Sequence, residues 1–212
     1  MSNHLLLIFV KDPEPGKSKT RLAATLGHDI ALAVYRDLLA HTCEQAQQLH
    51  ADKAVFYGNR IPEQDLWAAA GFPRFLQQGE DLGARMEQAF SWGFAQGYER
   101  ICIIGSDCAT LSTSRLEEAF QALDASDMVL GPALDGGYYL LGMKKLFTPV
   151  FRDKIWSTDQ VLIEALKDID DAGKSRHLLP PLSDVDVEAD LKDTFLAHYL
   201  AEKPKEDNGK KL

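Results

Sequence analysis

Positive charge is concentrated near the start of a chain that is acidic overall. Residues 11–21 read KDPEPGKSKTR, and four cations lie within these eleven positions: Lys11, Lys17, Lys19 and Arg21. Gly16 and two prolines shape this segment, which directly follows the apolar run Leu5–Val10. Cations and free backbone N–H groups at a strand-to-helix turn are what a di- or triphosphate requires. The pattern predicts a phosphate-binding loop, with a solvated basic loop as the alternative.

This segment does not match the P-loop of nucleotide-binding proteins. Gly16, Lys17 and Ser18 fit the G-K-S end of that motif, but the glycine that it requires five residues earlier is Lys11. Any phosphate binding here must therefore use a different arrangement.

Carboxylates at two other places are candidates for a metal site. Asp107 follows the strand-like run Arg100–Gly105, and a carboxylate at the end of a buried strand is well placed to hold a hard cation such as Mg²⁺. The alternative is that Asp107 caps a turn. Asp186, in the run DVDVEADL over residues 184–191, precedes an expected helix that it or Asp190 could cap. Asp186 gains interest only if the fold brings it to Asp107.

A third segment, DGGYY at residues 135–139, combines a carboxylate with flexible backbone and aromatic rings. Paired glycines let a ligand approach closely, and adjacent tyrosines supply stacking surface and hydroxyl groups. A hairpin turn with aromatic residues in the core explains the same pattern equally well.

The elements that must position these segments alternate between strands and helices. Apolar runs predict strands at residues 5–10, 53–57, 74–76, 100–105, 127–130 and 137–142. Helical periodicity predicts helices over residues 31–49, 63–70, 82–93 (capped by Asp81) and 188–200. Two capping boxes, Ser114–Glu117 and Ser157–Gln160, are expected to begin two further helices.

This alternation indicates one α/β domain over residues 1–202, a three-layer α/β/α sandwich with a mainly parallel sheet that becomes mixed between residues 109 and 177. The polar residues 203–212 are expected to form a flexible tail. In such sheets ligands bind at the carboxyl ends of the strands. The search for a site therefore narrows to the residues just after Val10, just after Gly105 and around Asp135.

Composition excludes several classes of protein. The 212 residues carry 23 Lys and Arg against 32 Asp and Glu, and a net charge of −9 is poorly suited to nucleic acid. No apolar run approaches the roughly 20 residues of a membrane helix, and no signal peptide is recognisable, so we expect a soluble, cytoplasmic protein. The three cysteines form no C-x-x-C pair and the six histidines are scattered, so neither a disulfide framework nor a zinc site is expected.

Six motifs, taken in order, resemble those of a known family. They are F-x-K-x-P-x-x-G-x-x-K-T-R-L from Phe9, Q-G-x-D-L-G-x-R-M from Gln78, G-S-D-C from Gly105, L-G-P-A-x-D-G-G-Y-Y-L-L-G from Leu130, W-S-T from Trp156 and D-V-D-V-x-x-D-L from Asp184. Over nearly its whole length the chain is similar to the bacterial glycosyltransferase-like family of nucleotide-diphospho-sugar transferases with the GT-A fold. Some members are labelled arsenosugar-biosynthesis glycosyltransferases. More distantly, the chain resembles guanylyltransferases of cofactor assembly.

The resemblance implies roles for individual residues. It implies that the nucleotide and its phosphates are bound by Lys11, Gly16, Lys19, Arg21, Asp81 and Arg85. It implies that Mg²⁺ or Mn²⁺ is coordinated by Asp107 and Asp186. The acceptor is expected to bind near Asp135, Gly136, Gly137 and Tyr138, and Asp135 is the candidate that orients or deprotonates the acceptor hydroxyl. Two departures from the family pattern are Ala109 in place of proline and Val187 in place of threonine.

The leading hypothesis is metal-dependent transfer of a sugar from a nucleotide-diphospho-sugar to a small acceptor. Its rival is nucleotidyl transfer, in which a nucleoside triphosphate reacts with a phosphorylated acceptor and releases pyrophosphate. In both reactions a divalent ion and positioned cations would stabilise charge on the leaving phosphates. A third hypothesis is a nucleotide-binding protein without catalysis, for which Ala109 and Val187 are the support. The base, the sugar, the acceptor and the oligomeric state are not specified by the sequence.

Overall fold

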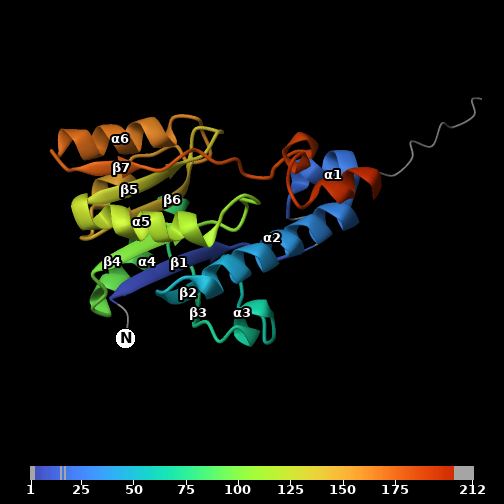
Figure 1. The fold of residues 1–212 in the computed structure, drawn as a ribbon, viewed down its shortest axis with the longest axis horizontal. Coiled ribbons are helices and arrows are strands. Elements are labelled where there is room, and N and C mark those ends of the chain that lie inside the picture. Colours follow the sequence, from blue (N-terminus) through green and yellow to red (C-terminus); the bar gives the residue numbers. More distant parts are fainter. Residues whose placement is uncertain (1–2, 15, 17, 203–212) are drawn as a thin grey trace, which may run out of the picture.

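Seven strands form one sheet in the computed structural model, which describes residues 3–14, 16 and 18–202 (Figure 1). The strands are β1 (His4–Val10), β2 (Asp52–Tyr57), β3 (Arg74–Leu76), β4 (Arg100–Ile104), β5 (Met128–Pro132), β6 (Tyr138–Met143) and β7 (Arg176–Leu178). Their order across the sheet is β3-β2-β1-β4-β6-β5-β7. Neighbouring strands pair in parallel except for β6, which runs antiparallel to both β4 and β5. The expected mixed, mainly parallel sheet is confirmed.

The reversal of β6 follows from its tight connection to β5. Ala133 donates its backbone N–H to the carbonyl of Gly137 (2.9 Å), which closes the turn that contains the DGG segment. Only antiparallel strands can be joined so closely, because a parallel pair needs a long crossover. The turn carries Asp135 to the same edge of the sheet at which β1 and β4 end.

Helices cover both faces of the sheet. On one face lie α2 (His28–Gln48) and α5 (Thr113–Ala125), and on the other lie α4 (Leu82–Ala95), α6 (Val161–Asp171) and the short 3₁₀ helix η1 (Thr148–Phe151). The alternation of side chains along β1 supplies both layers, because Leu6 and Ile8 join the first cluster whereas Leu5 and Leu7 join the second. The three-layer sandwich predicted from the sequence is therefore confirmed.

A third buried cluster joins the beginning and the end of the described chain. Leu22 of α1 (Thr20–Leu26) packs with Val185 and with Leu191 of η2 (Glu188–Leu191). Tyr199 of η3 (Ala197–Glu202) donates its hydroxyl to the Asp37 carboxylate in α2 (2.9 Å). Figure 1 shows this C-terminal segment, in red, beside α1. The packing fixes the chain around Val185 next to the basic loop.

Two predicted helix starts are wrong. α5 begins at Thr113 with Ser112 as its cap, since the Ser112 hydroxyl accepts the N–H of Arg115 (3.3 Å), so the box at Ser114–Glu117 does not form. α6 begins at Val161 without a side-chain cap. The proposed cap, Ser157, has a φ of 65°, whereas a capping residue needs extended backbone.

Other helices differ in length from the predictions. The helix expected over residues 63–70 is α3 (Leu66–Ala69), capped by the carboxylate of Asp65. The single helix expected over residues 188–200 is instead η2 and η3, and a φ of 60° at Asp193 interrupts the chain between them. α1 was not predicted, because seven residues are too few to show a helical period.

No helix in the described part of the chain combines the length and the apolar character needed to cross a bilayer. The tail predicted over residues 203–212 lies outside the described residues.

Candidate active site at the carboxyl ends of β1 and β4

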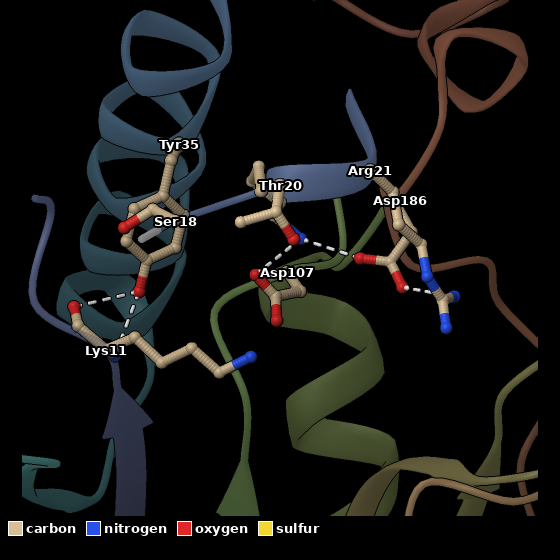
Figure 2. A pocket seen from close by; sticks show the side chains of 8 residues that line it. Lys11, Ser18, Thr20, Arg21, Tyr35, Asp107 and Asp186 are labelled. Atoms are coloured by element: carbon tan, nitrogen blue, oxygen red, sulfur yellow. Dashed lines mark hydrogen bonds and ion pairs between the residues drawn. The ribbon is translucent and has the colours of Figure 1, made fainter. Parts of the chain in front are cut away.

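The hydroxyl group of Tyr35 ties the basic loop to α2. It accepts the backbone N–H of Lys11 (2.9 Å) and donates to the carbonyl of the same residue (3.0 Å), as Figure 2 shows. It also lies 3.4 Å from the Oγ atom of Ser106. Burial raises the pKa of Tyr35, and the nearby negative charge of Asp107 adds to this effect, so the hydroxyl keeps its proton. Tyr35 thereby fixes the start of the loop against the end of β4.

Lys19 lies between two carboxylates at the centre of the site. Its Nζ atom is 2.7 Å from Oδ1 of Asp107 and 3.3 Å from Oδ1 of Asp186, and 4% of its side chain is exposed. Burial opposes the positive charge, but the two carboxylates outweigh it and the pKa of Lys19 is raised. Its backbone has a φ of 51°, a left-handed conformation that costs a non-glycine residue roughly 1–2 kcal/mol. Such strain often accompanies residues with a functional placement.

Backbone contacts bring Asp186 to Asp107 from a distant part of the sequence. Val185 donates its N–H to the carbonyl of Asp107 (2.8 Å). The carboxylate of Asp190 accepts the N–H groups of Asp186 and Val187, both at 2.8 Å, and so shapes the turn. Capping therefore accounts for Asp190 and leaves the side chain of Asp186 to face Lys19. From the sequence, Asp186 is a candidate metal ligand only if the fold brings it close to Asp107. The fold does so, because both carboxylates contact Lys19.

A second cation approaches the same carboxylate from the start of α1. The NH1 atom of Arg21 lies 3.7 Å from Oδ2 of Asp186, and Figure 2 marks this ion pair. The Arg21 side chain is 77% exposed, so solvent screens this pair and leaves the guanidinium accessible. Lys11 makes no ion pair with any carboxylate of the described residues. Lys11 and Arg21 therefore retain charge that an anionic ligand can use.

The two carboxylates suit a divalent cation shared with a substrate. One positive group, the Lys19 ammonium, already contacts both of them, so an oxygen of each faces a common position. Among the described residues, no three His, Cys, Asp or Glu side chains form a metal-binding cluster. Mg²⁺ commonly takes one or two protein carboxylates and completes its shell with phosphate oxygens and water, and Mn²⁺ favours the same oxygen donors. Asp107 and Asp186 thus fit an ion held jointly with a diphosphate.

Two adjoining cavities form one cleft around these groups. The smaller has a volume of about 190 Å³ and is lined by Ser18, Lys19 and Tyr35 among others. The larger, of about 360 Å³, extends to Tyr138 and Trp156. Four residues line both cavities: Lys11, Arg21, Asp107 and Asp186. We define the loop half of the cleft as these four residues together with Lys19, which lines the smaller cavity. The rest of the larger cavity is the aromatic half, and its charged and aromatic residues are Phe9, Asp135, Tyr138, Tyr139, Trp156 and Asp184.

The turn between β5 and β6 forms one wall of the aromatic half. Gly137 donates its N–H to Oδ1 of Asp135 (2.9 Å), so the turn holds one carboxylate oxygen. Gly136 has a φ of 91°, and a Cβ atom there would lie 2.4 Å from the carbonyl oxygen of Asp159. Only glycine fits this position, which makes Gly136 a structural residue of the turn.

Further lining of the aromatic half comes from α4, from Tyr138 of β6 and from the segment before α6. The indole ring of Trp156 packs on Gly83, where a Cβ atom would lie 2.6 Å from the ring. The hydroxyl of Tyr138 is directed at the Sδ atom of Met86 (4.0 Å). Burial raises the pKa of Tyr138, so its ring stays neutral. Met86, Tyr138 and Trp156 thus line the cleft with uncharged side chains.

Asp184 adds a half-buried carboxyl group to the aromatic half. Burial raises its pKa to about 7, the charge of Asp107 adds to this effect, and Lys19 opposes it. Asp184 belongs to the D-V-D run of the sequence, but within that run the resemblance assigns a metal role to Asp186 and none to Asp184. Trp156 belongs to the W-S-T motif, for which the sequence predicted no role. Tyr35 was predicted only as a buried residue on one face of a helix, and nothing in the sequence indicated its contact with Lys11.

The structure brings together most of the predicted site residues. Lys11, Lys19, Arg21, Asp107 and Asp186 meet in the loop half, while Asp135, Gly137 and Tyr138 line the aromatic half. Gly16, Asp81, Arg85 and Gly136 do not line either cavity.

The motif that contains Asp81 and Arg85 forms the start of α4. Asp81 is the N-cap, as predicted, because its carboxylate accepts the N–H of Ala84 (2.7 Å). Arg85 donates from Nε to the carbonyl of Gly79 (3.1 Å). Leu82, one residue beyond the cap, lines the cleft instead.

The mixed sheet, with a cleft at its carboxyl edge, is the fold of nucleotide-diphospho-sugar transferases and related nucleotidyltransferases. Residues 26–158 match the family described as "Uncharacterized protein conserved in bacteria (DUF2064)", and the chain belongs to this family. A crystal structure of a "putative nucleotide-diphospho-sugar transferase" from Desulfovibrio desulfuricans G20 shares 32% sequence identity over 95% of each chain, with a TM-score of 0.84. The family resemblance seen in the sequence is confirmed.

Two more distant structures share the fold. CMP:2-keto-3-deoxy-manno-octonic acid synthetase complexed with CTP has 14% identity over 95% of this chain and 100% of that chain, with a TM-score of 0.58. Rv0371C from Mycobacterium tuberculosis H37Rv, solved in complex with manganese, has 14% identity over 88% of this chain and 95% of that chain, with a TM-score of 0.50. None of the curated proteins matches the chain in sequence.

Proposed function

We propose that this protein is a metal-dependent transferase that moves a sugar from a nucleotide-diphospho-sugar to a small acceptor. The observation that carries the proposal is the meeting of Lys11, Lys19 and Arg21 with the carboxylates of Asp107 and Asp186 in one cleft. Cations and a shared divalent ion are what a leaving diphosphate needs. The relative from Desulfovibrio desulfuricans, with its 32% identity over 95% of each chain, supports the same class of reaction.

The loop half would bind the diphosphate of the donor. Lys11 and Arg21 have charge available at the mouth of this half, whereas the ammonium of Lys19 is held by Asp107 and Asp186. Binding of a divalent ion by these carboxylates would release Lys19 to the phosphates, since one group replaces the other as the neutralising cation. When bound, Mg²⁺ or Mn²⁺ would supply further stabilisation of the negative charge on the leaving nucleoside diphosphate.

The aromatic half would bind the sugar and the acceptor. Trp156 and Tyr138 offer rings on which the apolar face of a sugar can stack. Asp135 holds one oxygen in the turn through the N–H of Gly137, and its second oxygen has no hydrogen-bond donor among the described residues. That second oxygen is our candidate to orient the acceptor hydroxyl or to accept its proton.

The products distinguish this proposal from its rivals. The purified protein is incubated with Mn²⁺ and a panel of nucleoside triphosphates and nucleotide sugars, together with a mixture of small alcohols and phosphate esters. Release of a nucleoside diphosphate from a nucleotide sugar is expected. Release of pyrophosphate from a triphosphate would instead establish nucleotidyl transfer, and metal-dependent nucleotide binding without any product would establish a binding protein.

A further inference from the structure

We propose that the acceptor is an uncharged, hydroxyl-bearing molecule with one apolar face, and not a phosphorylated one. This inference rests on the proposed function, because it names the chemical class of the second substrate of that transfer. Two observations carry it: the distribution of charged side chains along the cleft and the aromatic walls.

Charge is unevenly distributed between the two halves of the cleft. Two cations, Lys11 and Arg21, line the larger cavity, and both lie at the end that it shares with the smaller one. The charged side chains that line the aromatic half, among the residues the structure describes, are Asp135 and Asp184, both carboxylates. A phosphate group there would find no cation and would face the carboxyl groups of Asp135 and Asp184.

A bound metal ion would not remove this asymmetry. Asp107 and Asp186 would be neutralised by the ion, but Asp135 and Asp184 belong to neither ion pair of Lys19. Both lie beyond the loop half, on the turn after β5 and on the segment before η2. The acceptor would still enter between carboxylates.

A phosphate monoester carries a charge of roughly −1.5 to −2 at neutral pH. In the aromatic half the carboxylate of Asp135 would repel such a group, and no cation of this half, among the residues that the structure describes, would offset the repulsion.

The walls favour a ligand with an apolar face and polar edges. Tyr138 and Trp156 contribute rings, and Leu82 and Met86 contribute aliphatic surface from α4. Hydrogen-bonding groups lie at the edges, where the second oxygen of Asp135 can accept a bond from an acceptor hydroxyl. A sugar, a cyclic polyol or a phenol has this combination of a flat face and hydroxyl groups.

The first experiment measures the charge of the aromatic half without any substrate. Trp156 lines this half, Trp67 is buried (1% exposed) and Trp92 packs against Phe56 and Phe75, so the difference between wild type and Trp156→Phe isolates the fluorescence of Trp156. Caesium and iodide ions are added as quenchers at constant ionic strength, with acrylamide as the neutral reference. Caesium is expected to quench Trp156 at least threefold more efficiently than iodide.

A charge-reversal variant sharpens this measurement. Asp135→Lys is expected to bring the caesium-to-iodide ratio close to one, whereas Asp171→Lys, an exposed position at the far end of α6, should leave the ratio unchanged. Iodide quenching of wild-type Trp156 as efficient as caesium quenching would overturn the inference, because the half would then admit anions freely.

The second experiment compares matched ligands in the presence of Mg²⁺ and a nucleoside diphosphate. Saturation-transfer NMR is recorded with glycerol and glycerol 3-phosphate, glucose and glucose 6-phosphate, and inositol and inositol 1-phosphate. Where a pair binds, the neutral member is expected to bind at least fivefold more tightly, and Asp135→Lys should reduce or reverse this preference. Tighter binding of a phosphorylated member to the wild-type protein would overturn the inference, and if no pair binds the quenching result decides.

These tests fail separately from the proposed function. If no nucleotide binds or pyrophosphate is released, glycosyl transfer is wrong while the quenching ratio still reports the charge of the aromatic half. If a nucleoside diphosphate is released but a phosphorylated acceptor is preferred, the transfer stands and the inference is wrong.

Discussion

The two halves of the cleft lie at the same edge of the sheet but differ in the cations that accompany their carboxylates. In the loop half, each carboxylate has a cationic partner: Asp107 and Asp186 contact Lys19, and Asp186 also contacts Arg21. In the aromatic half, Asp135 and Asp184 form no ion pair among the described residues, and burial raises the pKa of Asp184 to about 7 against the opposing charge of Lys19. The first half is prepared for an anion and a metal ion, and the second for a ligand without negative charge.

This difference teaches how one cleft can keep two substrates apart. A donor diphosphate entering the aromatic half would meet carboxylates, whereas in the loop half it would meet Lys11, Lys19 and Arg21. A neutral acceptor gains little from the cations and more from the aromatic surface. In the proposed reaction, charge would set the orientation of the donor, and shape would set that of the acceptor.

The largest effect is expected from Asp107→Asn. Loss of this charge removes one of the two carboxylates that face the proposed metal position, and turnover should fall by roughly 10²–10³-fold. Metal-dependent nucleotide binding, followed by thermal shift with and without Mn²⁺, should be lost as well. Asp171→Asn, an exposed change on α6, is the matched control. Unchanged Mn²⁺-dependent binding in Asp107→Asn would refute the metal assignment.

Lys19→Met should have effects of opposite sign on the two ligands of the loop half. Without its ammonium, Asp107 and Asp186 lose their shared partner, so Mn²⁺ alone should bind about tenfold more tightly, as measured by the electron paramagnetic resonance signal of free Mn²⁺. Nucleoside diphosphate binding with Mg²⁺ should weaken by about tenfold, because a phosphate-binding cation is lost.

The control for this variant is Lys167→Met, which removes an exposed lysine from α6. It should alter neither binding constant. If Lys19→Met weakened the binding of Mn²⁺ as well as that of the nucleotide, Lys19 would organise the carboxylates and would not compete with the metal ion for them.

Asp184→Asn should stabilise the protein by about 1–2 kcal/mol at pH 8, where the wild-type residue is charged. Burial and the carboxylates of Asp107, Asp135 and Asp186 disfavour that charge, and the amide has nearly the same shape. The free energy of unfolding in urea measures the change. A loss of stability would show that the charge of Asp184 is better compensated by Lys19 than the raised pKa indicates.

The smallest effect is expected from Tyr35→Phe, which deletes the hydroxyl that binds the backbone of Lys11. Unfolding free energy should fall by about 1 kcal/mol and nucleotide affinity by about fivefold, since the loop half loses an anchor. Tyr98→Phe is the control, because it removes a hydroxyl bonded to Asp52 (2.9 Å) that lies outside the cleft. Equal losses of nucleotide affinity in both variants would show that Tyr35 acts through stability alone.

Local patterns in the sequence were sufficient to predict the α/β/α architecture and the edge of the sheet at which the candidate site lies. The apolar run that becomes β1 and the basic loop after it are adjacent in the sequence, so their place at the carboxyl edge follows from the sheet alone. Asp81 was recognised as a cap for the same reason, since its partner, Ala84, is three residues away. The start of α5 was misplaced because Ser114 fits the capping pattern although Ser112 is the cap. The start of α6 was misplaced because Ser157 fits the same pattern but has a φ of 65°, and α6 has no side-chain cap.

The sequence by itself determined six of the seven strands, their mainly parallel arrangement, the cations of the loop and the identity of the carboxylates, because each depends on near neighbours in the chain; it gave no signal for β7, which has three residues. Only the tertiary structure decided that Val185 bonds to Asp107 and so places Asp186 against Lys19. It likewise decided that Asp184 is buried among carboxylates, and that Asp81 and Arg85 serve the start of α4. These facts depend on contacts between segments far apart in the chain, and no local pattern records which pairs of segments the packing of the core will bring together.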